Sequence, residues 1–441
     1  MNKWFSSCCL LLLGMVAFSA CTGETDKKPP NVILIMADDM GAETLGSYGN
    51  TVNKTPNLDA LAAKGILFSN CVSQPLCTPS RVKIMTGQYN YRNYEHFGFL
   101  GSDQYTFGNL MQDAGYTTCI AGKWQLNGLA YKEEIKDWAD ETRPRQFGFE
   151  EYCLWQLTKG RNEGERYADP LIEQNGEVLP RNAEAYGPDL FSDFVIDFIE
   201  RKKDEPFFVY YPMVLVHDPF VPTPDSKEWS EVEKRYDNDT IYFGEMVEYT
   251  DKIVGKIMAK LQELGIEDET LVIFTGDNGT HPTIYSHTSQ GIIQGAKGNT
   301  ITAGTHVPLI ASWGSRIKTP FAYEGLIEFS DFYPTLAALV GREVESDGKS
   351  FYKILEGDQN QLTRETAFVH YDPQWGKNVN KYRNQFVRNK EYKLYQDGSF
   401  YDLEKDVLET HKIPDDSLTI QEVQVKAQLE KEMARHPKWE R

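Results

Sequence analysis

Residues 31–41 read Asn-Val-Ile-Leu-Ile-Met-Ala-Asp-Asp-Met-Gly, and this stretch decides the fold class of the chain. After Asn31, residues 32–36 form a continuous apolar run rich in β-branched side chains. Such a run is typical of a central parallel strand that is buried on both faces. The run leads into Asp38 and Asp39. Because ligands of open α/β sheets bind beyond the carboxyl ends of the strands, these adjacent carboxylates favour a metal site over a solvated turn.

The same alternation of helix and strand recurs along the chain, and the strands lead to polar residues. A helix with Pro near its start and Gly past its end is expected at 55–65. The strand expected after it leads to Cys77, and later strands lead to Lys123, His217, Asp277 and Asn278. The other elements predicted are strands at 66–71, 116–121, 206–216, 270–275 and 307–313, and helices at 106–114, 188–203, 240–264 and 330–340. The alternation predicts an α/β fold with a large doubly wound, mostly parallel sheet flanked by helices.

The pattern becomes antiparallel from residue 367 onward. A hairpin is expected from strands at 388–395 and 400–403 around the turn Asp397-Gly398, with a terminal helix near 420–434. We therefore expect an α/β catalytic domain at 31–345 and a smaller C-terminal antiparallel-sheet subdomain with a helix at 346–441. Residues 128–186 carry many charges and little periodicity, which indicates an insertion over the site or a long excursion.

The charge balance of the chain limits its partners. The 441 residues carry a formal net charge of −19, which argues against a nucleic-acid partner. An anionic substrate must then be attracted by local cations rather than by the whole surface.

The first 20 residues have the features of a signal peptide. Lys3 supplies positive charge, and residues 8–18 are nearly all apolar but too few to span a bilayer. The small residues before Cys21 resemble a bacterial lipoprotein signal, which makes Cys21 the expected lipidated residue and 21–30 a tether; plain secretion with cleavage nearby is the alternative. We expect an exported, periplasmic or cell-surface bacterial lipoprotein that contacts the membrane only through this anchor.

The remaining cysteines do not form a disulfide scaffold. Of the seven cysteines, two lie in the signal segment and Cys21 is the expected lipid site. Cys71, Cys77, Cys119 and Cys153 are left, so at most one disulfide is expected if Cys77 is modified.

Cys77 stands just ahead of a predicted helix, in the run Cys-Thr-Pro-Ser-Arg at 77–81. Free backbone N–H groups and the helix dipole favour an anion there, and Arg81 adds positive charge one turn further on. A lone cysteine is more often a buried structural residue. The run, however, resembles the Cys-X-Pro-X-Arg signature of the type I sulfatases of the alkaline phosphatase-like superfamily. The resemblance implies that a formylglycine-generating maturation enzyme oxidises Cys77 to formylglycine, whose hydrate is the nucleophile.

The resemblance also implies a metal site. All of its expected ligands offer oxygen, without His or thiolate, which suits Ca²⁺, with Mg²⁺ second, and disfavours Zn²⁺. Calcium is the ion that the family implies. The expected ligands are the side chains of Asp38, Asp39, Asp277 and Asn278 and an oxygen of the modified Cys77.

The remaining catalytic roles follow from the same resemblance. Arg81, Lys123 and Lys297 would spread positive charge over the nucleophile and the transferring sulfuryl group. His217 would be the general acid that protonates the leaving alcohol. The implied reaction is hydrolysis of a sulfate ester with release of inorganic sulfate, and an exported bacterial enzyme points to a sulfated glycan as the substrate.

The chain departs from the family pattern at two positions. Type I sulfatases commonly read Gly-Lys-Trp-His-Leu-Gly, with the histidine helping to release sulfate, whereas Gln125 stands there in this chain. Gln cannot take up a proton as His can, so His281, His287 or water would do this work. His306 stands where many relatives carry Arg, and its role is left open.

Loops near the rim are expected to recognise the sugar. They contain further polar residues that we predict to contact substrate, together with Gln125, His281, His287 and His306. These further residues are Arg92, His96, His370 and Arg383.

Two alternative functions remain. The first is a phosphomonoester or phosphonate hydrolase of the same superfamily, since the fold alone does not fix the reaction. The absence of Zn-type His ligands and the presence of the maturation signature weigh against it. The second is a non-catalytic glycan-binding lipoprotein, against which the retention of every expected metal ligand argues.

Overall fold

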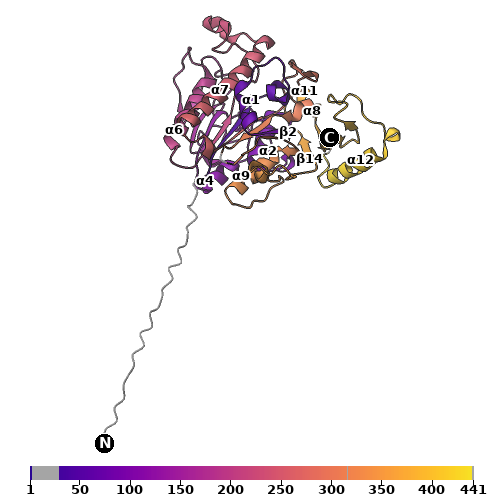
Figure 1. Ribbon diagram of the computed structural model, residues 1–441. Helices are drawn as coiled ribbons and strands as arrows, with labels where there is room; N and C mark the ends of the chain where they lie inside the picture. Colours follow the sequence, from indigo (N-terminus) through magenta and orange to yellow (C-terminus); the bar gives the residue numbers. More distant parts are fainter. Residues whose placement is uncertain (2–28, 315, 440–441) are drawn as a thin grey trace.

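The structure is a computed structural model that describes residue 1, residues 29–314 and residues 316–439 (Figure 1). The expected signal peptide, the lipid site at Cys21 and most of the tether lie outside the described residues. Within those residues, we find no helix with the length and apolar character needed to cross a membrane.

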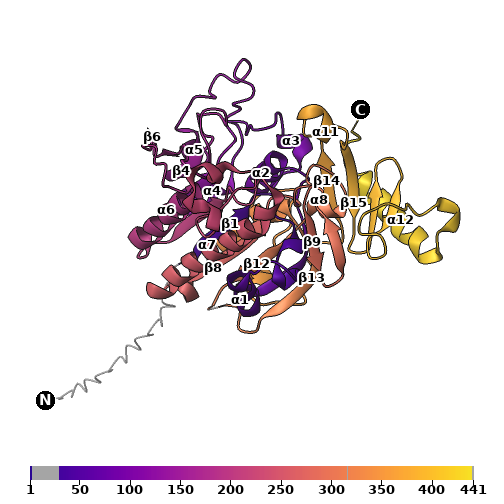
Figure 2. The ribbon, with the colours of Figure 1, turned by 90° about the horizontal axis from the view of Figure 1, so that it is seen from above.

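A large mixed sheet forms the centre of the molecule (Figures 1 and 2). Its strands are β1 (Asn31–Ala37), β2 (Ile66–Val72), β3 (Thr117–Lys123), β4 (Glu151–Trp155), β5 (Glu173–Gln174), β6 (Glu177–Val178), β7 (Phe207–Pro212), β8 (Thr270–Gly276), β11 (His306–Val307), β12 (Leu309–Ser312) and β13 (Phe321–Glu328). The strand order is β11-β2-β12-β8-β1-β7-β3-β4-β5-β6, and β13 also pairs with β2. Strands β8, β1, β7, β3 and β4 run parallel, whereas β12 runs antiparallel between β2 and β8. The predicted doubly wound, mostly parallel α/β fold is confirmed.

Helices cover both faces of this sheet. One face packs against α1 (Pro56–Lys64), α6 (Gly187–Lys202) and α7 (Phe243–Glu263), and the other against α2 (Cys77–Thr86), α4 (Phe107–Asp113), α9 (Phe332–Leu339) and α10 (Tyr352–Leu355). In β1, Ile33 and Ile35 join the first layer, and Val32 and Leu34 join the second. Because successive strand side chains point to opposite faces, this double coverage explains the continuous apolar run.

Short helices connect these elements in the described part of the chain. The short α-helices are α3 (Asn90–Asn93), α5 (Arg143–Gln146), α8 (Thr302–Thr305) and α11 (Gly376–Asn380). The 3₁₀ helices lie at Ala42–Thr44, Gly46–Tyr48, Lys227–Ser230, Val232–Tyr236, Thr240–Tyr242, Glu267–Glu269, Phe329–Asp331 and Asp415–Ser417. A separate hairpin is formed by β9 (Tyr285–Thr288) and β10 (Gly291–Gln294).

The C-terminal part forms a smaller antiparallel sheet with one packed helix, as predicted. The strands β14 (Ala367–Tyr371), β15 (Asn384–Arg388), β16 (Tyr392–Tyr395) and β17 (Phe400–Asp402) pair in chain order, and α12 (Ile420–Met433) packs on them. The single strand expected at 388–395 is wrong. The backbone turns at 389–391, where the Asn389 side chain accepts hydrogen bonds from the N–H groups of Glu391 and Tyr392. The domain boundary at residue 345 stays a prediction.

The strand expected at 206–216 ends earlier, at Pro212. Residues 213–216 stay buried, but their backbone leaves the ladder and bonds to the end of β1. The Asp38 N–H donates to the Leu215 carbonyl at 2.7 Å, and the Val216 N–H donates to the Asp38 carbonyl at 2.7 Å. Residues 213–216 form a buried apolar loop, and their apolar character made the predicted strand longer than the observed one.

Three further differences concern the sheet. The excursion at 128–186 contains β4, which pairs with β3, and β13 is a strand where none was expected. The strand expected at 307–313 is split at Pro308, which cannot donate a ladder hydrogen bond. The helix expected from 240 begins as a 3₁₀ turn, so that α7 starts at Phe243.

Candidate active site

The candidate residues gather where the central strands end. Asp38 and Asp39 follow β1, and Asp277 and Asn278 follow β8, the strand beside it. Lys123 is the last residue of β3, and Cys77 is the first residue of α2, which the chain reaches from β2. Since these strands are parallel, their carboxyl ends bring the side chains to one rim.

Three oxygens at this rim lack a partner. One oxygen each of Asp38 and Asp277 and the Sγ atom of Cys77 lie within 4.8 Å of one another. Oδ1 of Asp38, Oδ2 of Asp277 and Oδ1 of Asn278 are buried and accept no hydrogen bond from any described residue. Buried carboxylate and amide oxygens normally have a partner. The donor set therefore fits a hard divalent cation.

Lys123 and Arg81 bring positive charge to the same oxygens. Nζ of Lys123 donates to Oδ2 of Asp38 at 2.7 Å. Nη1 of Arg81 donates to the Lys123 carbonyl at 2.5 Å, and its Nε lies 3.8 Å from Oδ2 of Asp277. Burial raises the pKa of Asp38, but nearby cations, Lys123 first, bring this pKa below its usual value. Burial and the charges of Asp38 and Asp39 raise the pKa of Asp277 well above its usual value, and a cation bound at this carboxyl would favour its ionised form.

Asp39 is fixed from three sides. Its backbone is left-handed, with φ of 58°, and its N–H donates to Oδ1 of Asp277 at 2.9 Å. Its Oδ1 accepts from Nδ2 of Asn278 at 2.9 Å, and its Oδ2 accepts from Nζ of Lys297 at 2.5 Å. Burial alone would lower the pKa of Lys297, but the charges of Asp39, Cys77 and Asp38 outweigh this effect and raise the pKa above its usual value. The ammonium therefore stays charged.

His217 faces the rim with one ring nitrogen. Nδ1 lies 2.7 Å from the Asp218 carbonyl oxygen and 3.0 Å from Oδ1 of Asp218. Nε2 lies 2.9 Å from Nζ of Lys297. Because the Lys297 ammonium can only donate, Nε2 accepts with its lone pair, and the ring proton is assigned to Nδ1, beside the two Asp218 oxygens. Burial lowers the pKa of His217.

Arg166 lies beside His217, and no sequence pattern predicted it there. Its Nη2 lies 3.1 Å from Nδ1 of His217 and also donates to the Asp218 carbonyl. The buried guanidinium lies over the Trp155 ring, 4.6 Å from the centroid. Arg166 belongs to the 128–186 excursion, where no local pattern marks it. Only the pairing of β4 with β3, which sets Trp155 beside the rim, brings it to His217.

Cys77 lies beside the residue that departs from the expected motif. Its Sγ is 3.8 Å from Oε1 of Gln125, whose backbone is left-handed with φ of 49°. The Gln125 N–H donates to the Gln156 carbonyl at 3.1 Å. Burial raises the pKa of the Cys77 thiol, so the unmodified residue is a neutral thiol rather than a thiolate nucleophile.

The sequence comparisons agree with this geometry. Residues 30–342 match the Sulfatase family model, and residues 300–438 match the model for the C-terminal part of N-sulphoglucosamine sulphohydrolase. The chain belongs to the sulfatase family. The resemblance inferred from the Cys77 motif is thereby confirmed, and membership implies a metal ion and a formylglycine.

Two curated relatives of this sulfatase-family chain carry related names. N-acetylgalactosamine-6-sulfatase of Homo sapiens is 31% identical over 346 residues, which cover 73% of this chain and 64% of that protein. N-acetylgalactosamine-6-O-sulfatase of Bacteroides thetaiotaomicron is 28% identical over 414 residues, which cover 76% of this chain and 79% of that protein. The chain thus spans slightly less than two thirds of the first curated relatives that it matches.

A solved structure in complex with its substrate, D-glucosamine-2-N,6-O-disulfate, has the same fold. The TM-score is 0.73 at 22% identity, and the match covers 92% of this chain and 98% of that chain. At this identity the likeness shows the fold alone.

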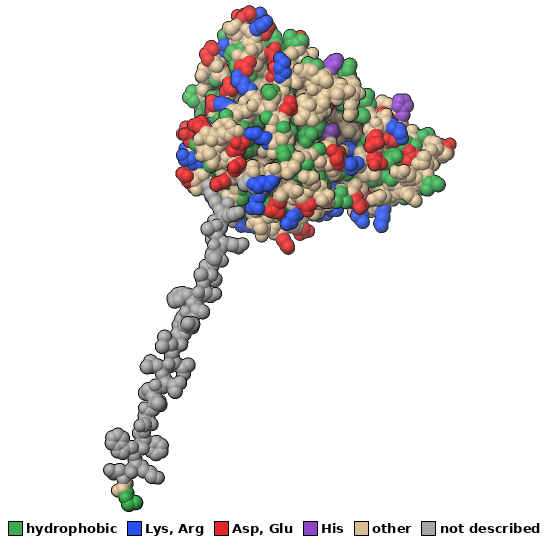
Figure 3. All heavy atoms as spheres, in the orientation of Figure 1, with side chains coloured by type: hydrophobic (Ala, Val, Ile, Leu, Met, Phe, Trp, Pro, Cys, Tyr) green, Lys and Arg blue, Asp and Glu red, His purple; other side chains and the backbone are tan. Residues whose placement is uncertain are grey.

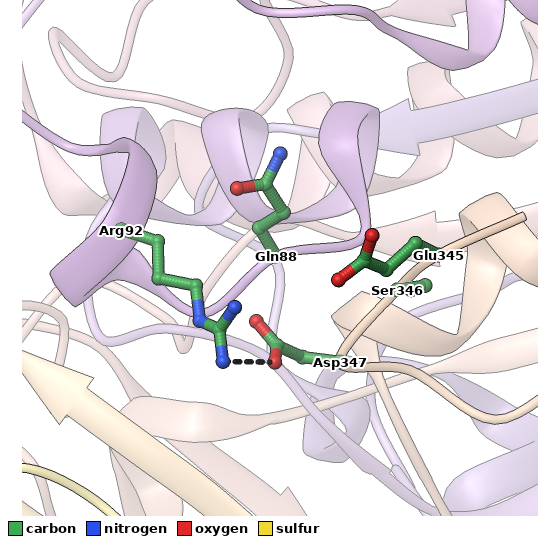
Figure 4. A pocket seen from close by; sticks show the side chains of 5 residues that line it. All are labelled: Gln88, Arg92, Glu345, Ser346 and Asp347. Carbon is green, nitrogen blue, oxygen red and sulfur yellow. Dashed lines mark ion pairs between the residues drawn. The ribbon is translucent and has the colours of Figure 1, made fainter.

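Arg92 of this sulfatase-family chain does not join the rim. It pairs with Asp347 at 3.2 Å in a pocket of about 480 Å³ (Figure 4). This pocket lies beyond the C-terminal end of α2, whereas Cys77 begins that helix. Ten helical residues span about 15 Å, so the pocket is separate from the metal ligands. The lining residues are Gln88, Arg92, Glu345, Ser346 and Asp347.

The three histidines of the central part make other contacts. Nε2 of His306 lies 3.0 Å from the Ser69 carbonyl oxygen, and burial lowers the pKa of His306 to about 4. Nδ1 of His281 lies 2.8 Å from Oγ1 of Thr283, and His287 is exposed on the β9 hairpin. No hydrogen bond joins any of the three to Cys77 in the described ranges 29–314 and 316–439. The roles predicted for His281 and His287 stay predictions.

The other predicted contacts lie on neighbouring loops. The ring of His96 packs against Tyr131, with centroids 4.6 Å apart. Nδ1 of His370 lies 2.7 Å from Oε1 of Gln385, and Nε of Arg383 pairs with Oδ1 of Asp372 at 2.6 Å. These contacts leave the roles predicted for His96, His370 and Arg383 as predictions.

Proposed function

We propose that this chain is a sulfuric ester hydrolase that removes sulfate from a sulfated glycan, with Cys77 converted to formylglycine. One observation carries the proposal. Asp38 and Asp277 lie in one cluster with the Cys77 side chain, and each has a buried oxygen without a hydrogen-bond partner, at a rim that also holds Lys123, Lys297 and Arg81. A sulfate ester is an anion, so a nucleophile with an oxygen-lined cation site and several fixed cations suits its transfer.

The residues that would hold the metal are Asp38, Asp39, Asp277 and Asn278, together with residue 77. Their donors are all hard oxygens once residue 77 carries an aldehyde hydrate, which favours Ca²⁺ over Mg²⁺ and Zn²⁺. When bound, the ion supplies positive charge for the sulfate oxygens, and formylglycine supplies a hydroxyl that can attack sulfur.

The remaining side chains would bind the sulfuryl group and move protons. Lys123 is held by Asp38 and Lys297 by Asp39, so both ammonium groups keep fixed positions at the rim. Arg81 is held by the Lys123 carbonyl and orients its charge towards Asp277. His217 and Lys297 share a hydrogen bond between Nε2 and Nζ, and the proton of this bond can pass to the leaving oxygen.

The whole surface would contribute little to attracting an anionic substrate. The net charge is −19, and Figure 3 shows acidic and basic side chains intermixed on the face in view. The fixed cations at the rim would therefore select the anion at short range. The relatives named for N-acetylgalactosamine sulfate support a sugar sulfate as the substrate.

The test begins with the peptide that contains Cys77. Mass spectrometry of protein produced together with a maturation enzyme should find the aldehyde at residue 77. Cys77→Ala should then abolish hydrolysis of sulfate esters without loss of fold, whereas Cys119→Ala, at a buried cysteine in β3, should remain active. Ordinary activity in Cys77→Ala would refute the nucleophile.

Parallel assays separate this function from its alternatives. A sulfate ester and the matching phosphate ester, such as the 4-methylumbelliferyl compounds, should differ strongly in favour of sulfate. Preference for phosphate would support a phosphoryl hydrolase of the same superfamily. No turnover of either ester by fully matured protein would support a glycan-binding lipoprotein.

We also propose that the chain is exported and anchored through lipid on Cys21. The proposal rests on the charged start, the apolar run and the small residues before Cys21. Fractionation of a bacterial host should place the full chain in the membrane fraction and Cys21→Ala in the soluble periplasmic fraction. Equal distribution of the two proteins would contradict the anchor.

A further inference from the structure

Trp375 is an exposed tryptophan that stacks on a buried ring. Its relative exposure is 42%, whereas that of Phe97 is 6%. The two rings are nearly parallel, with centroids 4.5 Å apart and planes inclined by 18°. Single exposed apolar residues are common, but the stack on Phe97 holds this indole in one position with part of its surface exposed to solvent.

The stack lies close to the candidate nucleophile. Phe97 shares an apolar cluster with Leu76 and Cys77. The N–H of Gly98, the next residue, donates to Oγ1 of Thr78 at 3.1 Å, and Thr78 directly follows Cys77. This bond and the shared apolar cluster place Phe97 next to the first turn of α2, which begins with Cys77.

The segment that carries Trp375 also borders Lys297. The helix α11, which follows Trp375, packs so closely on Gly298 that a Cβ atom there would lie 2.8 Å from Cγ1 of Val379. The helix α3 contacts β14, the strand that leads to Trp375, and the ring stack joins Phe97 to the same segment. Trp375 therefore belongs to a segment that contacts both the start of α2, through Phe97, and the residue after Lys297, through Val379.

The backbone holds the indole in place. Gln374 and Gly376, on either side of Trp375, are both left-handed, with φ of 48° and 63°. The Trp375 N–H donates to Oδ1 of Asn380 at 2.8 Å. A non-glycine residue in the left-handed region is strained, and such strain is found at ligand-binding positions.

Two tyrosines from other segments fix the same loop. The hydroxyl of Tyr94 donates to the Pro373 carbonyl at 2.8 Å, and that of Tyr131 donates to the Gln374 carbonyl at 3.3 Å. Tyr131 belongs to the 128–186 excursion and also packs on His96. Three separate segments thus meet to present one aromatic face, which indicates a built surface rather than a mobile loop tip.

We propose that Trp375 is a specificity-determining residue whose exposed face stacks on the pyranose ring of the sulfated substrate. The C–H groups on one face of a sugar ring pack well on an indole, and the rigid partner lowers the entropic cost of binding. The Phe97 ring stacks on the other face of the indole and fixes its orientation. The inference rests on the proposed function and adds a residue that recognises the sugar ring.

The test compares a sugar sulfate with inorganic sulfate. Wild-type enzyme is first assayed on N-acetylgalactosamine 6-sulfate, N-acetylglucosamine 6-sulfate and glucosamine 2-N,6-O-disulfate, and the best of these serves as the substrate. Trp375→Ala should raise its KM about 10-fold or more, with a smaller change in kcat. The inhibition constant of inorganic sulfate, which has no ring to stack, should stay unchanged.

Two control variants sharpen the comparison. Trp375→Phe keeps an aromatic face and should restore most of the KM. Tyr105→Ala removes an exposed aromatic residue whose neighbour, Gln104, contacts Gln88 beyond the far end of α2, and it should leave both constants unchanged.

Each other outcome has a definite meaning. An unchanged KM in Trp375→Ala would refute the proposed stacking of Trp375 on the sugar ring. Equal changes in KM and in the sulfate inhibition constant would also overturn it, because Trp375 would then support the sulfate pocket. If matured wild-type enzyme cleaves an aryl sulfate but none of the sugar sulfates, the proposed role of Trp375 is refuted while the sulfatase activity is retained. If it cleaves no sulfate ester, the proposed function itself is refuted.

Discussion

Asp277 provides one carboxyl of the proposed metal site. It is buried, its pKa is raised by burial and by Asp38 and Asp39, and its Oδ2 accepts no hydrogen bond from the described residues. Asp277→Asn removes one negative charge from the donor set. We expect calcium content and activity to fall about 100-fold or more, since ligand charge sets affinity for Ca²⁺.

Metal content by plasma mass spectrometry, with circular dichroism as a check on the fold, measures this effect. Asp189→Asn is the matched control, because Asp189 lies on α6 and accepts a hydrogen bond from the Tyr249 hydroxyl at 2.8 Å. That control should keep its metal. Full calcium content in Asp277→Asn would remove this residue from the proposed site.

Glu43 gives the chain a pH-dependent stability. Burial raises its pKa from 4.5 to about 7, although Thr280 donates a hydrogen bond to its Oε1 at 2.5 Å. Folding therefore favours the protonated form. Below pH 4.5 the carboxyl is neutral in both states, and as pH rises towards 7 the folded state resists ionisation and loses up to about 3 kcal/mol of stability.

Glu43→Gln should remove this loss, because the amide carries no charge and its oxygen can still accept from Thr280. Denaturant unfolding at pH 5 and pH 8 is the measurement. The difference in free energy of unfolding between variant and wild type should grow towards pH 8. A difference that does not vary with pH would mean that Glu43 ionises normally in the folded protein.

The helix that begins with Cys77 is anchored by a buried charge. On α2, Nζ of Lys83 lies 3.2 Å from Oε2 of Glu328 and donates to the Phe368 carbonyl at 3.0 Å. Both charged side chains are fully buried. Lys83→Met leaves Glu328 with one cation fewer and the carbonyl without its donor, so we expect a loss of about 3 kcal/mol in the free energy of unfolding.

An exposed pair provides the comparison for this helix anchor. Lys252 pairs with Asp225 at 2.7 Å, but both side chains are more than half exposed. Lys252→Met should change stability by less than about 1 kcal/mol, as surface pairs do. Equal losses in Lys83→Met and Lys252→Met, measured by denaturant unfolding, would show that burial adds nothing to the Lys83 contact.

The elements differ in how far their sequences reveal them. The runs that become β1 and β8 are apolar on both faces, and their ends were predicted to within a residue. β13 was missed because its exposure pattern is mixed, and residues 213–216 were assigned to a strand because burial alone made them apolar. A continuous apolar run reports burial, whereas a ladder depends on neighbours that the local sequence does not contain.

The same distinction applies to the site. Asp38, Asp39, Asp277 and Asn278 follow strands that the sequence marks clearly, so their meeting at one rim could be predicted. Arg166 reaches His217 from an excursion without periodicity, and Trp375 stacks on Phe97 across a long stretch of chain. Contacts of this kind depend on tertiary packing and leave no local pattern.

The two sheets share buried structure across the whole molecule. Val72, Leu76 and Cys77 belong to one apolar cluster with Val369 and Phe386 of the C-terminal sheet. Polar contacts cross the same boundary, because the Lys83 ammonium reaches the Phe368 carbonyl. A continuous buried boundary favours cooperative unfolding of both parts. We therefore expect calorimetry to show a single transition for the full chain.

Glu409 allows this cooperativity to be tested from the C-terminal side. Its Oε1 accepts from Nζ of Lys393 at 3.0 Å and from the Thr302 N–H at 2.7 Å, so it ties the C-terminal sheet to the segment that follows Lys297. Burial lowers the pKa of Lys393 to about 8, and Glu409 opposes this effect. Glu409→Gln leaves that buried ammonium without its carboxylate and should cost about 3 kcal/mol. If the molecule unfolds as one unit, the variant shifts the midpoint of the single transition to lower temperature, with calorimetric and van't Hoff enthalpies still equal. A separate early transition in Glu409→Gln, with the later one unmoved, would show that the C-terminal sheet unfolds on its own.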